Sequence, residues 1–108
     1  MSLQLPRGVA AYFKADGEGG EAVARCFADE GVVKDECETH KGRAAIAAWK
    51  AAASAKYNYR SEPIAMAEQD GQVVVTGRVT GDFPGSPLDL RYFFTLDGDL
   101  IAALEIRP

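Results

Sequence analysis

Helical spacing of apolar residues dominates this chain up to about residue 57 and strand alternation dominates after it, and that contrast limits the fold more than any other feature. Before residue 57, apolar residues recur at helical intervals, as at Leu5, Val9 and Tyr12. After it they alternate, and every even position from Leu88 to Leu96 is apolar. Helices followed by strands predict an α+β fold in which helices cover one face of a mainly antiparallel sheet.

The same patterns predict where each element lies. We expect helices near residues 5–13, 21–28 and 43–55, a strand at 32–36, a polar loop through 39–41, and four hairpin-linked strands between 57 and 106. Asp70-Gly71 and Asp97-Gly98 are hairpin signals, and Pro63 indicates a bulge or a sheet edge. Such strands would twist and curve round the helix expected at 43–55, and a curved sheet under a helical lid leaves a concave end for a ligand.

Composition restricts the class of protein. The chain has 108 residues, the size of one domain, and a net charge of −4 with 12 Lys and Arg against 16 Asp and Glu. The basic residues are scattered singly, which argues against nucleic acid or an anionic membrane as partner. The first six residues show no secretion signal, no apolar run approaches the ~20 residues of a membrane span, and the two cysteines are expected to be reduced. We therefore expect a cytoplasmic protein.

The segment 27–36 contains the first candidate catalytic residue, Asp35. Alternation along the predicted strand puts Val33, Asp35 and Cys37 on one face. If that face is buried, Asp35 is a carboxylate in an apolar setting, which is one way to make a general base. The alternatives are that Asp35 caps the following turn or pairs with Arg43.

His40 is the only histidine, so a site with several histidine ligands is excluded. It is either a catalytic partner of Asp35 or an exposed loop residue. Cys37 is a candidate ligand contact, and as a nucleophile it would need His40 as its base. No nucleotide-binding motif or metal-ligand cluster is visible, so we expect no cofactor and no metal.

Several aromatic residues could form the wall of a pocket or fill a core. Four carry hydroxyl groups, which a closed core accepts less readily, so we expect at least two of these to line a cavity. The candidates for ligand contact or catalysis are Tyr12, Trp49, Tyr57, Tyr59, Tyr92 and Phe94. Phe93 and Val74 instead fall on the opposite sheet face, and they predict a homodimer through that outer face.

Four motifs resemble a known superfamily: FADE at 27–30, VKD at 33–35, HKGRAAI at 40–46 and LDGDLI at 96–101. Over nearly its whole length the chain is similar to the nuclear transport factor 2-like superfamily. The resemblance is to its SnoaL-like domains, which include polyketide cyclases and ketosteroid isomerases. It implies one SnoaL-like domain over residues 1–108, a cone-shaped cystatin-like fold, a deep apolar pocket and commonly a dimer.

The isomerase branch also implies site residues. There, an aspartate on the first strand abstracts a proton next to a carbonyl, and Asp35 falls at that position. A tyrosine on the first helix of these enzymes corresponds to a position near Ala10, two residues from Tyr12. An acid on a later strand corresponds to a position near Tyr92.

These observations lead to three hypotheses. The first is proton-transfer chemistry, of an isomerase or cyclase type, on an apolar carbonyl compound with Asp35 as base and Tyr12 or Tyr92 as hydrogen-bond donor. The second is a non-catalytic binder of a small apolar molecule. The third is an association module whose sheet face matters more than its cavity.

Overall fold

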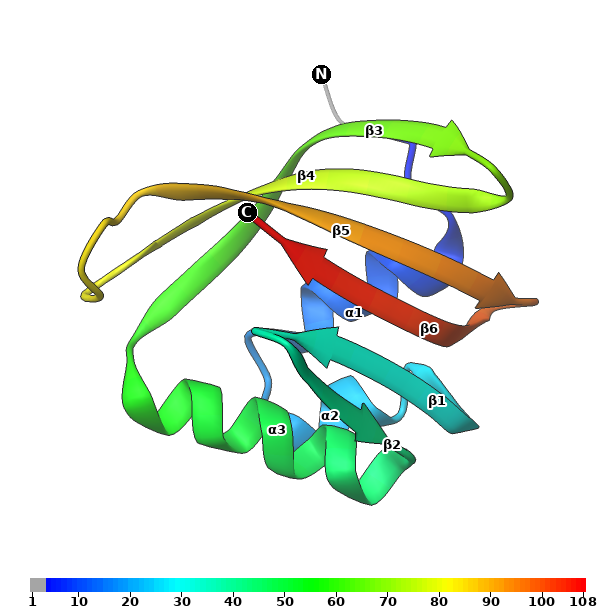
Figure 1. Cartoon of the computed structure of the whole chain (residues 1–108), viewed down its shortest axis with the longest axis horizontal. Coiled ribbons are helices and arrows are strands. Elements are labelled where there is room, and N and C mark those ends of the chain that lie inside the picture. Colours follow the sequence, from blue (N-terminus) through cyan, green and yellow to red (C-terminus); the bar gives the residue numbers. More distant parts are fainter. Residues whose placement is uncertain (1–3) are drawn as a thin grey trace.

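The computed structural model describes residues 4–108, so part of the segment from which we predict no secretion signal lies outside it. Three helices and six strands follow one another along the chain (Figure 1). They are α1 (Arg7–Ala15), α2 (Gly20–Ala24), β1 (Phe27–Asp35), β2 (Glu38–Lys41), α3 (Arg43–Lys56), β3 (Tyr59–Gln69), β4 (Gln72–Gly81), β5 (Leu88–Asp97) and β6 (Leu100–Arg107). Within the described residues, no helix is both long and apolar enough to cross a membrane.

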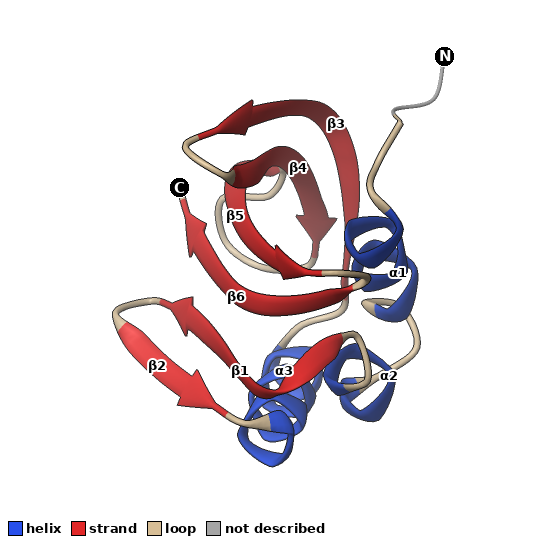
Figure 2. Cartoon of the chain, turned by 90° about the vertical axis from the view of Figure 1, so that its right-hand side faces the viewer, coloured by secondary structure: helices blue, strands red, loops and turns tan. Residues whose placement is uncertain are grey.

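The six strands form one curved, open sheet with the order β2-β1-β6-β5-β4-β3. All neighbouring pairs are antiparallel except β1 and β6, which run parallel. Breaks in register within the β1–β6, β3–β4 and β5–β6 pairs add bends to the ordinary twist. Figure 2 shows the sheet curling around the side on which the helices lie. The predicted α+β fold with a curved, mostly antiparallel sheet is confirmed.

The predicted polar loop through residues 39–41 is wrong, because β2 lies there. Glu36 and Cys37 form a two-residue turn with positive φ angles of 53° and 65°, the conformation that joins tightly paired strands. Neither residue is the Gly or Asn that normally signals such a turn. β2 is also an edge strand with mostly exposed side chains, so it lacks apolar alternation.

The predicted second helix is also too long at its carboxyl end. α2 stops at Ala24, and the chain enters β1 at Phe27, five residues before the strand start predicted at Val32. The backbone N–H of Ile101 donates to the Cys26 carbonyl at 2.9 Å, and Phe27 pairs with Ile101. Pairing with β6 therefore replaces the last helical turn that local spacing suggests.

Other local predictions are confirmed. The β3–β4 register shifts between Pro63 and Ala65, as expected for a bulge at the proline. Asp70 and Gly71 both have positive φ angles in the β3–β4 turn, and Gly98 has one in the β5–β6 turn. These turns fix which side chains of the long strands face inward.

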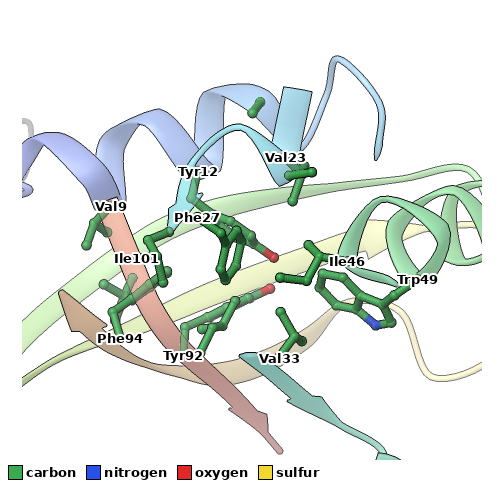
Figure 3. Packing of buried hydrophobic residues seen from close by; sticks show 14 of the residues in the cluster. Val9, Tyr12, Val23, Phe27, Val33, Ile46, Trp49, Tyr92, Phe94 and Ile101 are labelled. Carbon is green, nitrogen blue, oxygen red and sulfur yellow. The ribbon is translucent and has the colours of Figure 1, made fainter. Parts of the chain in front are cut away.

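The core lies between the inner sheet face and the helices (Figure 3). Its largest fully buried side chains come from all three helices and from four strands: Tyr12, Phe27, Phe94, Ile46, Ile101, Leu104, Val9, Val23, Val33 and Val75. Along the inward face of β5, exposure rises from 0% at Phe94 and 3% at Tyr92 to 41% at Leu88. The core therefore ends near Tyr92, and the remaining inward face of β5 borders open space.

The outer sheet face carries the two apolar residues from which we predict a dimer. Val74 and Phe93 lie opposite each other on β4 and β5. The guanidinium groups of Arg91 and Arg107 lie 5.6 and 4.9 Å from the centre of the Phe93 ring. Phe93 is thus partly covered within its own chain, and the homodimer stays a prediction.

The contact between α2 and α3 requires a glycine. A Cβ atom added at Gly20 would overlap the carbonyl oxygen of Ala47, which is backbone and cannot turn aside. We expect Gly20→Ala to lower the free energy of unfolding by about 1–3 kcal/mol, the usual effect of overpacking. Urea unfolding followed by circular dichroism measures it.

Gly17→Ala is the matched control, because an added Cβ there has its nearest neighbour at 4.0 Å. We expect it to change stability by less than about 0.5 kcal/mol. Equal effects at the two positions would contradict a close approach of α2 to α3.

Candidate functional site

A pocket of about 650 Å³ opens where the inward face of β5 leaves the core. Its wall comes from the end of α1, the β1–β2 hairpin, the inner side of α3 and the inner faces of β3 to β6. Six aromatic side chains line it: Tyr12, Trp49, Tyr57, Tyr59, Phe83 and Tyr92. Its ionisable groups other than tyrosine are Asp35, Glu36, Glu38, His40, Lys50 and Lys56.

A second hollow, of about 300 Å³, is lined only by the consecutive residues 68–73 of the β3–β4 hairpin. It is the open surface of a turn and brings no distant residues together. The larger pocket is therefore the candidate site. No group of three or more His, Cys, Asp or Glu residues that could hold a metal is found within residues 4–108.

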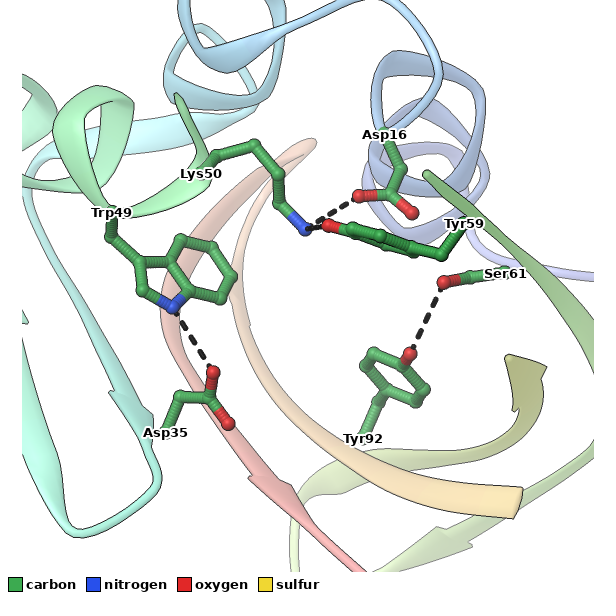
Figure 4. A network of polar contacts seen from close by, with 7 residues as sticks. All are labelled: Asp16, Asp35, Trp49, Lys50, Tyr59, Ser61 and Tyr92. Atoms are coloured by element: carbon green, nitrogen blue, oxygen red, sulfur yellow. Dashed lines mark hydrogen bonds and ion pairs between the residues drawn. The ribbon is translucent and has the colours of Figure 1, made fainter. Parts of the chain in front are cut away.

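Asp35, the last residue of β1, lies in the pocket wall and is half-buried. Its Oδ2 accepts a hydrogen bond from the Trp49 indole N–H at 3.1 Å (Figure 4). The alternative that Asp35 pairs with Arg43 is wrong. Arg43 instead contacts Asp29 at 2.9 Å and donates to the carbonyl of Phe27, also at 2.9 Å.

The indole therefore holds one oxygen of the Asp35 carboxylate from the α3 side. Oδ1 makes no hydrogen bond within the part of the chain that the structure describes. A carboxylate with one oxygen fixed and the other unclaimed can accept a proton from a molecule in the pocket.

A buried ion pair that sequence analysis did not predict lies deeper in the site. Lys50 Nζ is 2.6 Å from Asp16 Oδ1, and each side chain is only 5% exposed. Lys50 also donates to the Tyr59 hydroxyl at 2.9 Å (Figure 4). Within residues 4–108, Asp16 Oδ1 has no partner besides this ion pair.

Aromatic rings surround the same ammonium group. Its Nζ lies 4.6 Å from the centre of the Trp49 ring, 5.4 Å from that of Tyr59 and 5.8 Å from that of Tyr12. Burial by itself lowers the pKa of Lys50, but the charge of Asp16 and the hydrogen bonds outweigh it, so the pKa is raised above 10.5. Lys50 is thus a permanent cation at neutral pH and not a nucleophilic amine.

A sequence signal for Lys50 exists in retrospect. Ile46, Trp49 and Lys50 follow one another at i, i+3 and i+4 on α3, so the lysine occupies a position of the buried stripe. A lysine on a buried stripe requires a partner. The sequence does not say which acid that partner is, because Asp16 follows a different helix.

Tyr12 and Tyr92 both lie in the pocket wall, with ring centres 6.2 Å apart. Figure 3 shows both hydroxyl ends pointing toward the side where Trp49 lies. The Tyr92 hydroxyl donates to Ser61 Oγ at 3.5 Å, a long hydrogen bond. Burial is the main cause that raises the pKa of Tyr92 to about 12, and burial followed by the charge of Asp16 raises the pKa of Tyr12 well above 10. Both are neutral hydroxyl donors at neutral pH.

His40 lies on β2 and not in an exposed loop, so that alternative is wrong. It is half-buried, lines the pocket, and its ring centre is 6.0 Å from that of Trp49. His40 pairs with Val33 across the β1–β2 ladder, whereas Asp35 pairs with Glu38. The described residues show no hydrogen bond between His40 and Asp35.

The remaining predicted contact residues divide into two groups. Tyr57 and Tyr59 line the pocket, and Tyr57 packs against Phe83 with ring centres 6.0 Å apart. Phe94 and Cys37 do not line it. Phe94 is fully buried in the core, and Cys37 is exposed in the turn after β1, where it no longer shares the face of Asp35.

Ionisation of the buried tyrosine on β5 makes stability depend on alkaline pH. The pKa of Tyr92 is higher in the folded chain than in the unfolded one, so its contribution is present below pH 10 and lost as pH rises to about 12. The raised pKa of Lys50 acts with the same sign, above pH 10.5. We expect the stability lost between pH 8 and 11 to be about 1 kcal/mol smaller in Tyr92→Phe, measured by urea unfolding. An equal loss in both proteins would contradict the burial of this hydroxyl.

Residues 8–104 match the model of the SnoaL-like domain. A crystal structure of a Sinorhizobium meliloti protein proposed to be a polyketide cyclase is 39% identical, with 99% of each chain covered and a TM-score of 0.91. No curated protein matches the chain.

Two more distant structures share the fold. One is a Catenulispora acidiphila protein with a ketosteroid isomerase-like fold, crystallised with trimethylamine. It is 22% identical with a TM-score of 0.84, and the match covers 97% of this chain and 87% of that one. The other is a cystatin-fold protein from Novosphingobium aromaticivorans, 16% identical with a TM-score of 0.77 over 99% of this chain and 100% of that one. By the match over residues 8–104, the chain belongs to the SnoaL-like domain family and has its nuclear transport factor 2-like fold.

Proposed function

We propose that this protein catalyses cofactor-independent proton transfer, of an isomerase or cyclase type, on a small apolar carbonyl compound, with Asp35 as the general base. The observation that carries the proposal is the Asp35 carboxylate itself. It is half-buried in the wall of the pocket, with one oxygen bound to the Trp49 N–H and the other unclaimed by the described residues.

The chemistry needs few parts. Asp35 takes a proton from the carbon next to the carbonyl, and the electron pair of the C–H bond forms an enolate. The proton then returns to another carbon, which is isomerisation. Alternatively, the enolate carbon attacks a second carbonyl of the same molecule and the oxygen of that carbonyl takes the proton from Asp35, which is cyclisation. A general base contributes about 10²–10⁴-fold to such a step.

The pocket supplies the setting for this reaction. Its aromatic wall favours a flat apolar ligand, and its hydroxyl groups supply donors for the carbonyl oxygen. The likeness to a Sinorhizobium meliloti protein proposed to be a polyketide cyclase supports the cyclase form of the proposal.

The binding hypothesis uses the same pocket without chemistry. An open volume of about 650 Å³ beside Trp49, Tyr57 and Tyr92 favours either of these pocket functions over an association module, which would need no cavity. The homodimer through the outer sheet face and the cytoplasmic location stay predictions.

Hydrogen–deuterium exchange tests the base directly. We expect the protein in D2O to accelerate exchange of the α-hydrogens of 2-tetralone, acetylacetone or 3-cyclohexenone, followed by proton NMR. Asp35→Asn cannot accept the proton, so we expect a fall of about 10²–10⁴-fold in that acceleration. Glu30→Gln, an exposed acid on the same strand and outside the pocket, is the control.

Exchange that is equally fast in Asp35→Asn and wild type would refute Asp35 as the base. Saturable binding of these ketones without any exchange would favour the non-catalytic binder.

A further inference from the structure

Lys50 is the most unusual group in the pocket wall. Its side chain is a cation that is only 5% exposed, and it lines a pocket for which we propose an apolar ligand. An ammonium group has three N–H donors. One faces Asp16 at 2.6 Å and one faces the Tyr59 hydroxyl at 2.9 Å. No third acceptor is present within residues 4–108, so one donor is left for a molecule in the pocket.

Tyr59 provides a second donor beside it. Its oxygen accepts the hydrogen bond from Lys50, so its own proton is not used in that contact. No acceptor for that proton is found in the described part of the chain. Tyr92, by contrast, already donates to Ser61. Lys50 and Tyr59 therefore offer two adjacent donors on the α3 and β3 side of the pocket, and within the described residues the hydroxyls of Tyr12 and Tyr57 make no hydrogen bond either.

The charges around the pocket favour the oxygen of a neutral ligand over that of an anionic ligand. Asp16 balances the charge of Lys50, and Asp35, Glu36 and Glu38 add negative charge that Lys56 offsets only in part. His40 is the other titratable side chain of the rim, apart from the tyrosines. A ligand that arrives as an anion meets this excess of carboxylates. A neutral carbonyl does not, and it still gains two donors.

Trp49 places these donors relative to the base. Its N–H binds Asp35 at 3.1 Å, and the Lys50 ammonium lies 4.6 Å from the centre of its ring (Figure 4). The carboxylate and the ammonium thus contact the same indole. A flat molecule lying along that indole can reach both groups at once.

We propose that Lys50 and Tyr59 bind the carbonyl oxygen of a neutral, flat ketone or ester whose acidic C–H group faces Asp35. The proposal rests on the proposed function for the role of Asp35 and adds the binding residues for oxygen and the class of substrate. As the proton moves to Asp35, the C–H electron pair becomes a C=C bond and the carbonyl oxygen becomes negative. Lys50 and Tyr59 then donate to that oxygen and keep their own protons, so no other reactant is required.

The test uses 2-naphthol, a flat bicyclic alcohol whose oxygen resembles that of an enol or enolate. Binding is measured by fluorescence titration in an Asp35→Asn background, which removes one negative charge as proton transfer would. Naphthalene, which has the same rings without the oxygen, is the matched ligand.

Two variants remove the donors in different ways. Lys50→Met alone would leave Asp16 buried and unpaired, so it is combined with Asp16→Asn. Tyr59→Phe removes one hydroxyl and leaves the ion pair in place. Lys14→Met, an exposed lysine of α1 outside the pocket, is the control. Thermal unfolding of each variant confirms that it is folded.

We expect Lys50→Met with Asp16→Asn to weaken 2-naphthol binding by about tenfold or more, since it loses a charged donor, and Tyr59→Phe to weaken it by about three- to tenfold. Naphthalene binding should stay within about twofold in both. Lys14→Met should bind both ligands like its parent.

The proposal is overturned if both donor variants bind 2-naphthol like their parent, or if they lose naphthalene to the same degree, which would indicate a purely structural role. It is also overturned if the Asp35→Asn protein binds 2-naphthol no better than naphthalene. Oxygen-specific binding without exchange in the wild type would leave this oxygen site standing and remove Asp35 as a base. Hydrogen–deuterium exchange that depends on Asp35 but not on Lys50 or Tyr59 would support Asp35 as the base and overturn the oxygen site.

Discussion

The buried ammonium of Lys50 joins three parts of the fold around the pocket. Lys50 belongs to α3, Asp16 follows α1, and Tyr59 begins β3. A charge removed from water is unfavourable unless its partners lie at the right distance, so these three groups fix the end of α1 and the middle of α3 against the start of β3. The floor of the site is therefore a polar contact in an otherwise apolar region. Its geometry specifies the pocket as well as the packing.

The inner wall of the pocket depends on two neighbouring residues of α3. Trp49 and Lys50 are about 100° apart around the helix axis, so they cover adjacent strips of the same wall. The indole reaches Asp35 on β1 and also packs near His40 on β2. One aromatic side chain thus links the acidic hairpin to the buried cation, and this explains why base and donor share a single cavity.

Membership of the SnoaL-like family accounts for the scaffold and leaves the chemistry to particular residues. Asp35 lies at the end of β1 in the pocket wall, where its carboxylate binds the Trp49 N–H. Tyr92 on β5 donates to Ser61. A lysine with a balancing aspartate lies next to the central tryptophan. Two residues of α3, Trp49 and Lys50, thus make the polar contacts of this wall of the pocket.

Local features of the sequence were enough to predict much of the architecture. The change of period near residue 57, the Asp70-Gly71 turn and the Pro63 bulge all act through neighbours in the chain, and the structure contains all three. The edge strand β2 was not predicted for two reasons. Glu36 and Cys37 form its turn without the Gly or Asn that usually signals one, and an edge strand needs no apolar face.

The sequence by itself determined the α+β order, the inward face of β5 and the place of Asp35 near the end of the first strand, because alternation along a chain is local. Only the tertiary structure decided that Lys50 meets Asp16, that β1 pairs in parallel with β6, and that Tyr92 borders a pocket while Phe94 is sealed in the core. These outcomes depend on where separate helices and strands end in space. Periodicity along one chain carries no information about such distances.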